Sequence, residues 1–223
     1  MGTITAEAMI NRCANILADP DNVRWTREEL LSHLNDAQRA CILNRPEVNP
    51  HVADFDCVAA TMQTIPADAF ELINVIRNKQ GNVTRPVVLE RRENLDRYNK
   101  TWHDAPSSFT HVAVYTYEPQ FRTRFFLYPM PAANHTIEIV YSKIPTEITA
   151  EASTIEIDDV YEPGLINFML FRSYSKDSGV QGADANNAEA YYVKFLDMFP
   201  ARDMAQQRLR PADQVNLARE QSR

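Results

Sequence analysis

The residues best suited to acid–base chemistry are two adjacent carboxylate pairs, Glu28-Glu29 and Asp158-Asp159. A glycosidase needs only two carboxylates, one to protonate the leaving group and one to act as base or nucleophile. Both pairs also stand at predicted helix starts, where acidic side chains stabilise the free backbone N–H groups and the positive end of the helix dipole. Because capping explains both pairs, the pattern favours helix starts over a catalytic site.

The other reactive side chains form no catalytic or metal-binding motif. His33 and Asp36 share a helix face, which favours a surface hydrogen bond over a metal site. The sequence holds no phosphate-binding glycine motif and no G-x-S-x-G nucleophile motif. The cysteines lack C-x-x-C spacing and are expected to be buried free thiols in a reducing compartment; they are Cys13, Cys41 and Cys57. The sequence therefore predicts no catalytic residue, no cofactor and no metal site.

Aromatic residues gather between positions 115 and 128, and two interpretations are open. On strands they would form either a platform for stacked nucleic-acid bases or the core between two sheets. The formal net charge of −7 favours the core, because a groove that grips DNA needs clustered Lys and Arg. The residues are Tyr115, Tyr117, Phe121, Phe125, Phe126 and Tyr128.

Helical patterns lie at both ends of the sequence. Apolar residues at helical spacing predict a first helix that ends at Asp19-Pro20. Thr26 and Glu29 have the spacing of a capping box, and Trp25 and Leu30 that of a hydrophobic staple, so a second helix should begin there. Helices return after Asp158, and a polar loop over residues 178–187 separates two of them. The last helix is expected to end near Pro200.

The middle of the sequence predicts β-structure. Runs rich in β-branched and aromatic residues are expected to form short strands. A hairpin is expected around Gln80-Gly81-Asn82, a turn at Pro66-Ala67-Asp68, and a helical turn within residues 95–102. The predicted strands cover residues 58–63, 71–77, 85–91, 111–117, 124–128, 137–141 and 154–157.

This order predicts an α+β fold, in which an antiparallel helical bundle from both chain ends carries an inserted antiparallel β-sheet or sandwich region. The expected division is residues 1–48 and 158–200 for the bundle, 49–157 for the β-rich insertion, and 201–223 for an extended C-terminal arm. The last segment has few large apolar residues, so it is either a frayed terminus or an arm that orders on a neighbouring subunit or partner. No apolar run reaches the roughly 18 residues of a membrane helix, and no secretion signal is seen.

Several short sequence blocks follow one another from about residue 20 to 200. The first spans Trp25 to Leu31 and continues with Leu34 to Ala40 and Arg45-Pro46. Later blocks are Gln63 to Asp68, Leu72-Ile73 with Arg77-Asn78, Asn94 to Asp96 with Trp102-His103, Phe126 to Pro129, Tyr141 to Pro145 and Phe171 to Asp177. In content and in order, these blocks resemble the head-to-tail adaptor (connector or gatekeeper) family of tailed double-stranded DNA phages.

The resemblance implies a structural protein of the virion, located at the head–tail junction after synthesis in the host cytoplasm. Copies are expected to form a dodecameric ring under the portal protein, to extend the DNA channel without sequence-specific DNA binding, and to dock the tail tube or nozzle. The C-terminal arm is expected to bind the portal through its arginines, Arg202, Arg208, Arg210, Arg219 and Arg223. Two alternatives stay open: a virion-associated peptidoglycan-degrading enzyme, and a small virion binding or decoration protein.

Overall fold

The chain folds into two compact units, one helical and one β-rich. The computed structural model describes residues 2–81, 84–104, 110–176 and 182–200. Residues 1–49 and 144–201 form the helical unit, and residues 50–143 form the β-unit. Helices from both ends of the sequence therefore belong to one unit, and the α+β class predicted from the sequence is confirmed.

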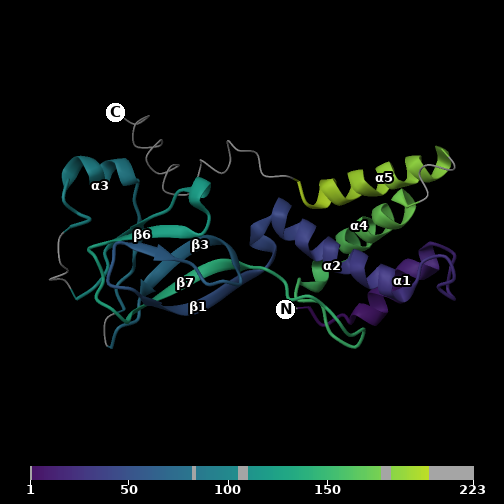
Figure 1. The fold of residues 1–223 in the computed structure, drawn as a ribbon, viewed down its shortest axis with the longest axis horizontal. Helices are drawn as coiled ribbons and strands as arrows, with labels where there is room; N and C mark the ends of the chain where they lie inside the picture. Colours follow the sequence, from purple (N-terminus) through teal and green to yellow (C-terminus); the bar gives the residue numbers. More distant parts are fainter. Residues whose placement is uncertain (1, 82–83, 105–109, 177–181, 201–223) are drawn as a thin grey trace. The chain divides into compact units, whose positions relative to one another are not determined.

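The helical unit contains four α-helices in its described part (Figure 1). These are α1 (Ala6–Ile16), α2 (Arg27–Asn44), α4 (Glu162–Ser175) and α5 (Gly182–Met198), with short 3-10 turns η1 (Pro46–Val48) and η3 (Asp159–Tyr161). Helix α4 packs against α1, α2 and α5. The side chains that are fully buried in this unit include Met9, Ile10, Leu30, Leu34, Phe195 and Phe199.

The start of α2 confirms half of the predicted capping box. The Thr26 side chain caps the helix by accepting a hydrogen bond from the Glu29 backbone N–H at 3.3 Å. The Glu29 carboxylate does not complete the box, because it pairs with Lys176 Nζ at 2.8 Å. Trp25 and Leu30 are both buried, as the predicted staple requires.

Two sheets enclose the core of the β-unit. One has the order β1-β7-β3 and the other β2-β6-β5-β4. The short helix α3 (Arg92–Tyr98) and the 3-10 turn η2 (Pro119–Phe121) also belong to this unit. The strands are β1 (Pro50–Cys57), β2 (Met62–Thr64), β3 (Ala69–Asn78), β4 (Val88–Leu89), β5 (Val114–Thr116), β6 (Arg124–Tyr128) and β7 (His135–Lys143).

The core of the β-unit draws side chains from both sheets. Leu72 and Ile139 come from one sheet, and Phe125 and Leu127 from the other, and all four are completely or almost completely buried. Their positions follow the period-two alternation of strands, with apolar residues on the inner face of β6 and β7. The predicted sandwich interior is therefore present, but the sheets are not wholly antiparallel as predicted, because β4 and β5 pair in parallel.

The Asn78 side chain links several segments at the strand ends of the β-unit through hydrogen bonds. Its Nδ2 donates to the backbone oxygens of Arg85 and Val112, at 2.9 and 2.8 Å. Its Oδ1 accepts from the Val112 backbone N–H and from His135 Nε2, both at 2.8 Å. Because that oxygen can only accept, His135 must carry its proton on Nε2. The side chain is fully buried and fully hydrogen-bonded.

Several sequence predictions of local structure need correction. The strand expected at 58–63 is a bend followed by β2, and β1, which precedes it, is absent from the predictions. The strand expected at 154–157 is a single bridge between Thr5 and Thr154. The predicted partner of β3 also differs, because β3 pairs with β7 and contacts the 85–87 segment only through a few hydrogen bonds. Finally, α5 begins at residue 182, inside the predicted loop.

Candidate functional site

The two carboxylate pairs lie at helix starts, as predicted. Glu28 and Glu29 occupy the first turn of α2. Asp158 caps η3, because its Oδ1 accepts from the Val160 backbone N–H at 3.0 Å. Asp159 binds the N-terminal segment, which the sequence did not predict. Its carboxylate accepts hydrogen bonds from the Thr3 backbone N–H at 2.8 Å and from Thr3 Oγ1 at 2.6 Å. These bonds lower the Asp159 pKa and fix the N-terminal segment.

The three cysteines are buried and free, as predicted. Burial raises the pKa of Cys13 and of Cys57 to about 12, and it raises the Cys41 pKa as well. All three are therefore thiols at neutral pH, and a thiol is a poor nucleophile and a poor metal ligand.

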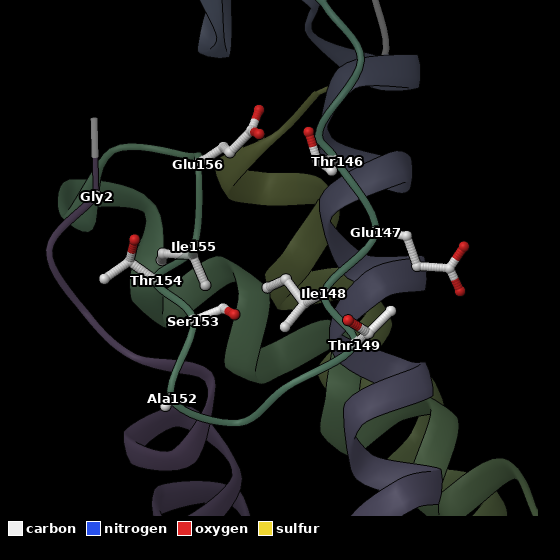
Figure 2. A pocket seen from close by; sticks show the side chains of 10 residues that line it. All are labelled: Gly2, Thr146, Glu147, Ile148, Thr149, Ala152, Ser153, Thr154, Ile155 and Glu156. Carbon is white, nitrogen blue, oxygen red and sulfur yellow. The ribbon is translucent and has the colours of Figure 1, made fainter.

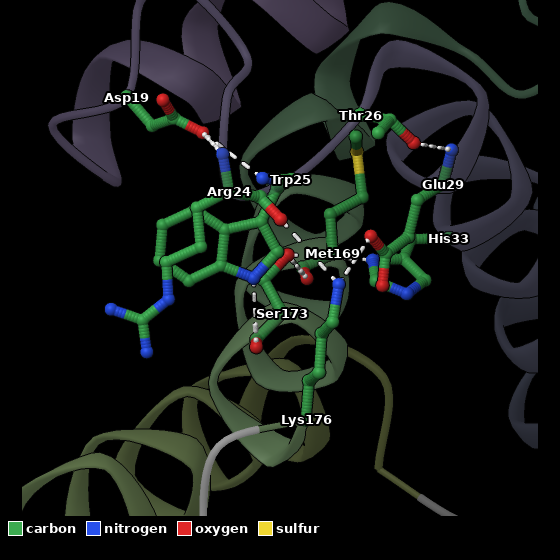
Figure 3. Close-up of polar contacts among 9 residues, drawn as sticks. All are labelled: Asp19, Arg24, Trp25, Thr26, Glu29, His33, Met169, Ser173 and Lys176. Atoms are coloured by element: carbon green, nitrogen blue, oxygen red, sulfur yellow. Dashed lines mark hydrogen bonds and ion pairs between the residues drawn. The ribbon is translucent and has the colours of Figure 1, made fainter.

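A buried serine and histidine meet between α2 and α4 (Figure 3). Ser173 Oγ lies 3.3 Å from His33 Nδ1 and donates to the Met169 backbone oxygen at 2.9 Å. The pair has the residue types of a nucleophile and its base. Ser173, however, is completely buried and its proton already has an acceptor within α4. The contact therefore joins two helices and has no access for a substrate.

His33 corrects one prediction, because its partner is Ser173 and not Asp36. Asp36 instead pairs with Arg39 at 3.5 Å and with Arg172 at 3.4 Å. Burial lowers the His33 pKa, so the neutral imidazole is favoured.

Trp25, in the segment before α2, also contacts Ser173 of the Ser173 and His33 pair (Figure 3). Its indole Nε1 donates to the Ser173 backbone oxygen at 3.1 Å. Asp19 holds the preceding segment by accepting backbone N–H bonds from Val23, Arg24 and Trp25. This network positions the entry to α2, which gives it a structural role.

The aromatic residues of the β-unit pack mainly inward. Tyr115, Tyr117 and Phe125 belong to the buried core, which confirms the core interpretation for them. Phe121 is 53% exposed, and Phe126 contacts Trp102 edge-on at a ring separation of 6.0 Å. The six residues therefore do not share one exposed face on which bases could stack.

A charged face covers the outside of the β1-β7-β3 sheet. Asp54 and Glu138 lie directly opposite each other on neighbouring strands, where like charges repel. Lys79 lies between them, with its Nζ 2.6 Å from Asp54 and 3.5 Å from Glu138. Arg77 pairs with Glu138 at 2.7 Å. The face therefore combines both signs of charge and does not form a basic track for DNA.

A pocket of about 620 Å³ opens on the helical unit (Figure 2). It lies between residues 146–149 and residues 152–156, with Gly2 at its edge. Ile148 and Ile155 are its buried apolar residues, and the rim carries hydroxyl groups and the side chains of Glu147 and Glu156. We name this pocket the slot. The sequence offers only one signal for it, a run rich in Thr, Ser and Ala from residue 146 to 154.

The charge is distributed unevenly between the two units. The helical unit has 8 basic and 17 acidic residues, a formal charge of −9, whereas residues 50–143 have 10 of each and are neutral. Residues 202–223 have five Arg and three acids, a charge of +2. The net negative charge of the protein therefore comes from the helical unit.

The predicted partner-binding arginines lie outside the described residues. They are Arg202, Arg208, Arg210, Arg219 and Arg223. In the part of the chain that is described, no three His, Cys, Asp or Glu side chains are placed to hold a metal ion. Within the same part, no helix has the length and apolar character needed to cross a bilayer.

Comparison with known families identifies the family of the chain. The sequence matches the SU10 adaptor protein family over residues 4–217. The chain belongs to this family. The resemblance to phage head-to-tail adaptors is thereby confirmed, and the match includes both units and continues past α5. No curated protein matches the sequence.

Adaptors of this family are structural proteins of phage particles, which places the chain among virion components. Its partners are accordingly other structural proteins of the phage. Of the candidate reactive residues described above, the three cysteines and Ser173 are buried, and Asp158 takes part in a helix cap.

Proposed function

We propose that this adaptor forms a ring under the portal of a tailed phage, extends the DNA channel and docks the tail tube or nozzle. The observation that carries the proposal is the family match, which spans 214 residues from 4 to 217. The ring is proposed to be dodecameric, to match the portal. The role is structural, and surface complementarity between copies replaces catalytic chemistry.

A closed ring requires a heterologous contact, in which one surface of a copy meets a different surface of the next. We propose that the helical unit, acting as an antiparallel bundle, and the β-unit supply these two surfaces. Each unit has exposed large apolar side chains that contacts between copies would bury. In the helical unit they are Ile16, Val23, Leu43, Ile144, Val160, Tyr192 and Val193, and in the β-unit they are Val52, Val58, Met62, Val88, Tyr98 and Phe121.

The distribution of charge is compatible with a channel wall. DNA slides most freely past a surface that does not bind phosphate, and neither described unit carries net positive charge. Of the three parts of the chain, the C-terminal arm, residues 201–223, is the one with a net basic charge. We propose that its arginines pair with acidic side chains of the portal. The three-part division predicted from the sequence stays a prediction.

The carboxylate pairs noted in the sequence do not support the peptidoglycan-degrading alternative. A glycosidase holds two carboxylates on opposite sides of a substrate cleft. Asp158 and Asp159 are used by a helix cap and by the N-terminal segment, and Glu29 is paired with Lys176. The decoration-protein alternative differs from an adaptor in stoichiometry, which can be measured.

Native mass spectrometry of the purified chain, with and without portal protein, tests the proposal. We expect complexes in which the number of adaptor copies equals the number of portal copies. Binding at any other fixed ratio, or no binding to the portal, would contradict the proposal. A parallel turnover assay on purified peptidoglycan should give no product, and product formation would support the enzyme instead.

A further inference from the structure

The slot is bordered on one side by an extended segment that is already paired along its outer edge. Thr5 and Thr154 form an antiparallel bridge, in which Ala6 N–H donates to the Ser153 oxygen and Ile155 N–H to the Ile4 oxygen, at 2.9 and 3.0 Å. In a trans peptide the C=O and N–H groups point in opposite directions. The N–H and C=O of Thr154 must therefore point away from the N-terminal segment.

The segment on the opposite side of the slot, residues 146–149, is likewise hydrogen-bonded along its outer edge. Asn35 on α2 binds Ile148 twice, because its Nδ2 donates to the Ile148 oxygen at 3.0 Å and its Oδ1 accepts from the Ile148 N–H at 2.9 Å. The same peptide geometry turns the Glu147 C=O and the Thr149 N–H away from α2. Among the described residues, these two groups and the N–H and C=O of Thr154 make no hydrogen bond.

These four backbone groups border the slot from its two sides. Figure 2 shows the N-terminal segment outside residues 152–156, a helix behind residues 146–149, and the Ile148 and Ser153 side chains between the two segments. The buried Ile148 and Ile155 alternate with exposed Thr149 and Thr154, as on two strands that share one apolar floor. Such an arrangement accepts a further strand through main-chain hydrogen bonds.

The C-terminal arm has a segment that fits this arrangement. Residues 211–219 begin with Pro211, which is favoured at a strand start. Val215 and Leu217 follow at a spacing of two, with Gln214 and Asn216 polar between them, so both apolar side chains would face the Ile148 and Ile155 floor. The family match extends to residue 217 and therefore includes this segment.

Charge favours an approach of the arm to this unit. The residues that lead to the segment, 201–210, have a formal charge of +2, whereas the helical unit that holds the slot has −9. Residues 211–219 themselves are neutral, because Asp213 offsets Arg219, and Glu147 at the slot is already paired with Arg39 at 3.4 Å. The arm is therefore attracted to the unit through residues 201–210, whereas main-chain hydrogen bonds and apolar contacts would hold the strand in the slot.

We propose that the slot binds residues 211–219 of the adjacent copy in the ring as an added strand. The inference rests on the proposed function, since it assigns one contact between neighbouring copies. Residues 201–210 then span from one copy to the next, over at most about 33 Å when extended. Arg202, Arg208 and Arg210 in this span and Arg223 after the strand stay free to face the portal, so of the five proposed portal-binding arginines only Arg219 would belong to the added strand.

Cross-linking within intact phage particles tests the proposal with the full chain. The double variant Thr154→Cys/Asn216→Cys places one new thiol at an exposed position of the slot and one at the polar position between Val215 and Leu217. The native cysteines do not interfere, because all three are buried. A short bis-maleimide should join neighbouring copies into a ladder that extends beyond dimers on a denaturing gel.

The two single variants are the controls for this experiment, and three other outcomes would overturn the inference. Thr154→Cys and Asn216→Cys alone lack one of the two thiols, so neither should give a ladder. A cross-linked monomer would show that the arm folds back on its own copy, and an Asn216→Cys bond to portal would show that this segment binds the portal. An unmodified monomer would also exclude arm binding in the slot. If the adaptor were absent from particles, the proposed function itself would fail, which is a separate observation.

A matched pair of substitutions tests the main-chain hydrogen bonds. In Thr154→Pro the slot loses one N–H donor, while the Ser153 and Ile155 groups that bind the N-terminal segment remain. Thr154→Ala keeps the donor. We expect the proline variant, built into a Ser153→Cys/Asn216→Cys background, to lose at least half of the ladder, and the alanine variant to keep it. Equal ladders for the proline and alanine variants in this background would contradict binding by strand addition.

Discussion

The side-chain amide of Asn35 binds both backbone polar groups of Ile148, with its two bonds at 3.0 and 2.9 Å. Asn35 is 6% exposed in the middle of α2, a place where asparagine is not a favoured helix residue. Its amide replaces a neighbouring strand for the extended segment 146–149. One side chain thus satisfies the backbone on one side of the slot and leaves the other side open.

Asn35→Ala should therefore destabilise the helical unit, because it leaves the Ile148 N–H and C=O without partners. We expect a loss of about 2–4 kcal/mol in the free energy of unfolding, since each buried unsatisfied group costs about 1–3 kcal/mol. Chemical denaturation measures the loss. Asn15→Ala on the exposed face of α1 is the matched control, and it should change stability by less than about 0.5 kcal/mol. Equal effects at the two positions would refute this role for Asn35.

The stability of the helical unit should fall at mildly acidic pH because of His33. Burial lowers the His33 pKa below its ordinary value of about 6.5, so the unfolded chain takes up a proton before the folded chain does. The contribution of neutral His33 is complete above about pH 6.5 and is lost as the pH falls toward the lowered pKa. Glu29 and Asp36 oppose the shift, and Arg172 and Lys176 reinforce it.

His33→Gln removes the titrating group and should flatten the pH dependence of unfolding between pH 7 and 5. Unfolding should be followed through the near-ultraviolet signal of Trp25, which belongs to the same cluster. His135 in the β-unit also has a pKa lowered by burial, so His135→Gln is the informative comparison. An unchanged slope at the Trp25 signal in His33→Gln would show that His33 is not the group responsible.

Gly164→Ala should loosen the contact between α4 and the end of α5. A Cβ atom at Gly164 would lie 2.7 Å from Met198 Sδ and would overlap the Phe199 ring. Overpacking of this kind costs about 1–3 kcal/mol. Hydrogen exchange should speed up at the end of α5, where Phe199 packs on Tyr161 at a ring separation of 5.4 Å. Gly81→Asn, in open space at a φ of 56°, should cost little. Unaltered exchange in Gly164→Ala would contradict this packing.

Ending the chain after Pro200 should leave both units folded but weaken binding to the portal. The deleted residues hold all five proposed partner-binding arginines, and the core residues of both units precede them. Thermal unfolding and a portal binding isotherm measure the two effects. A full-length variant with the five arginines changed to glutamine separates charge from length, and it should also bind with a shallower salt dependence. Unchanged portal binding in both variants would show that the arm does not contribute to portal binding.

Local signals in the sequence predicted those elements that depend on consecutive residues with a clear pattern. The start of α2 depends on Thr26 and its immediate neighbours, and β6 depends on five consecutive residues, so both were found. Strand β1 was missed because it begins at Pro50 and has charged Asp54 and Asp56 on its outer face. Its stability comes from pairing with β7, whose paired residues are 78 to 92 positions away in sequence.

The slot depends on contacts that no local pattern encodes. Asn35 and Ile148 are 113 residues apart, and Thr5 and Thr154 are 149 apart. The same holds for the contact between His33 and Ser173, where the sequence instead favoured Asp36 as the partner of His33. Family membership, in contrast, was visible in the order of many short blocks, although no single block has a chemical role.

Electron cryomicroscopy of intact particles tests the central claim most directly. The account predicts a ring of this chain between portal and tail, with one copy per portal subunit and DNA density along its axis. Density for the chain elsewhere on the particle, or a junction complete without it, would contradict the assignment as a head-to-tail adaptor.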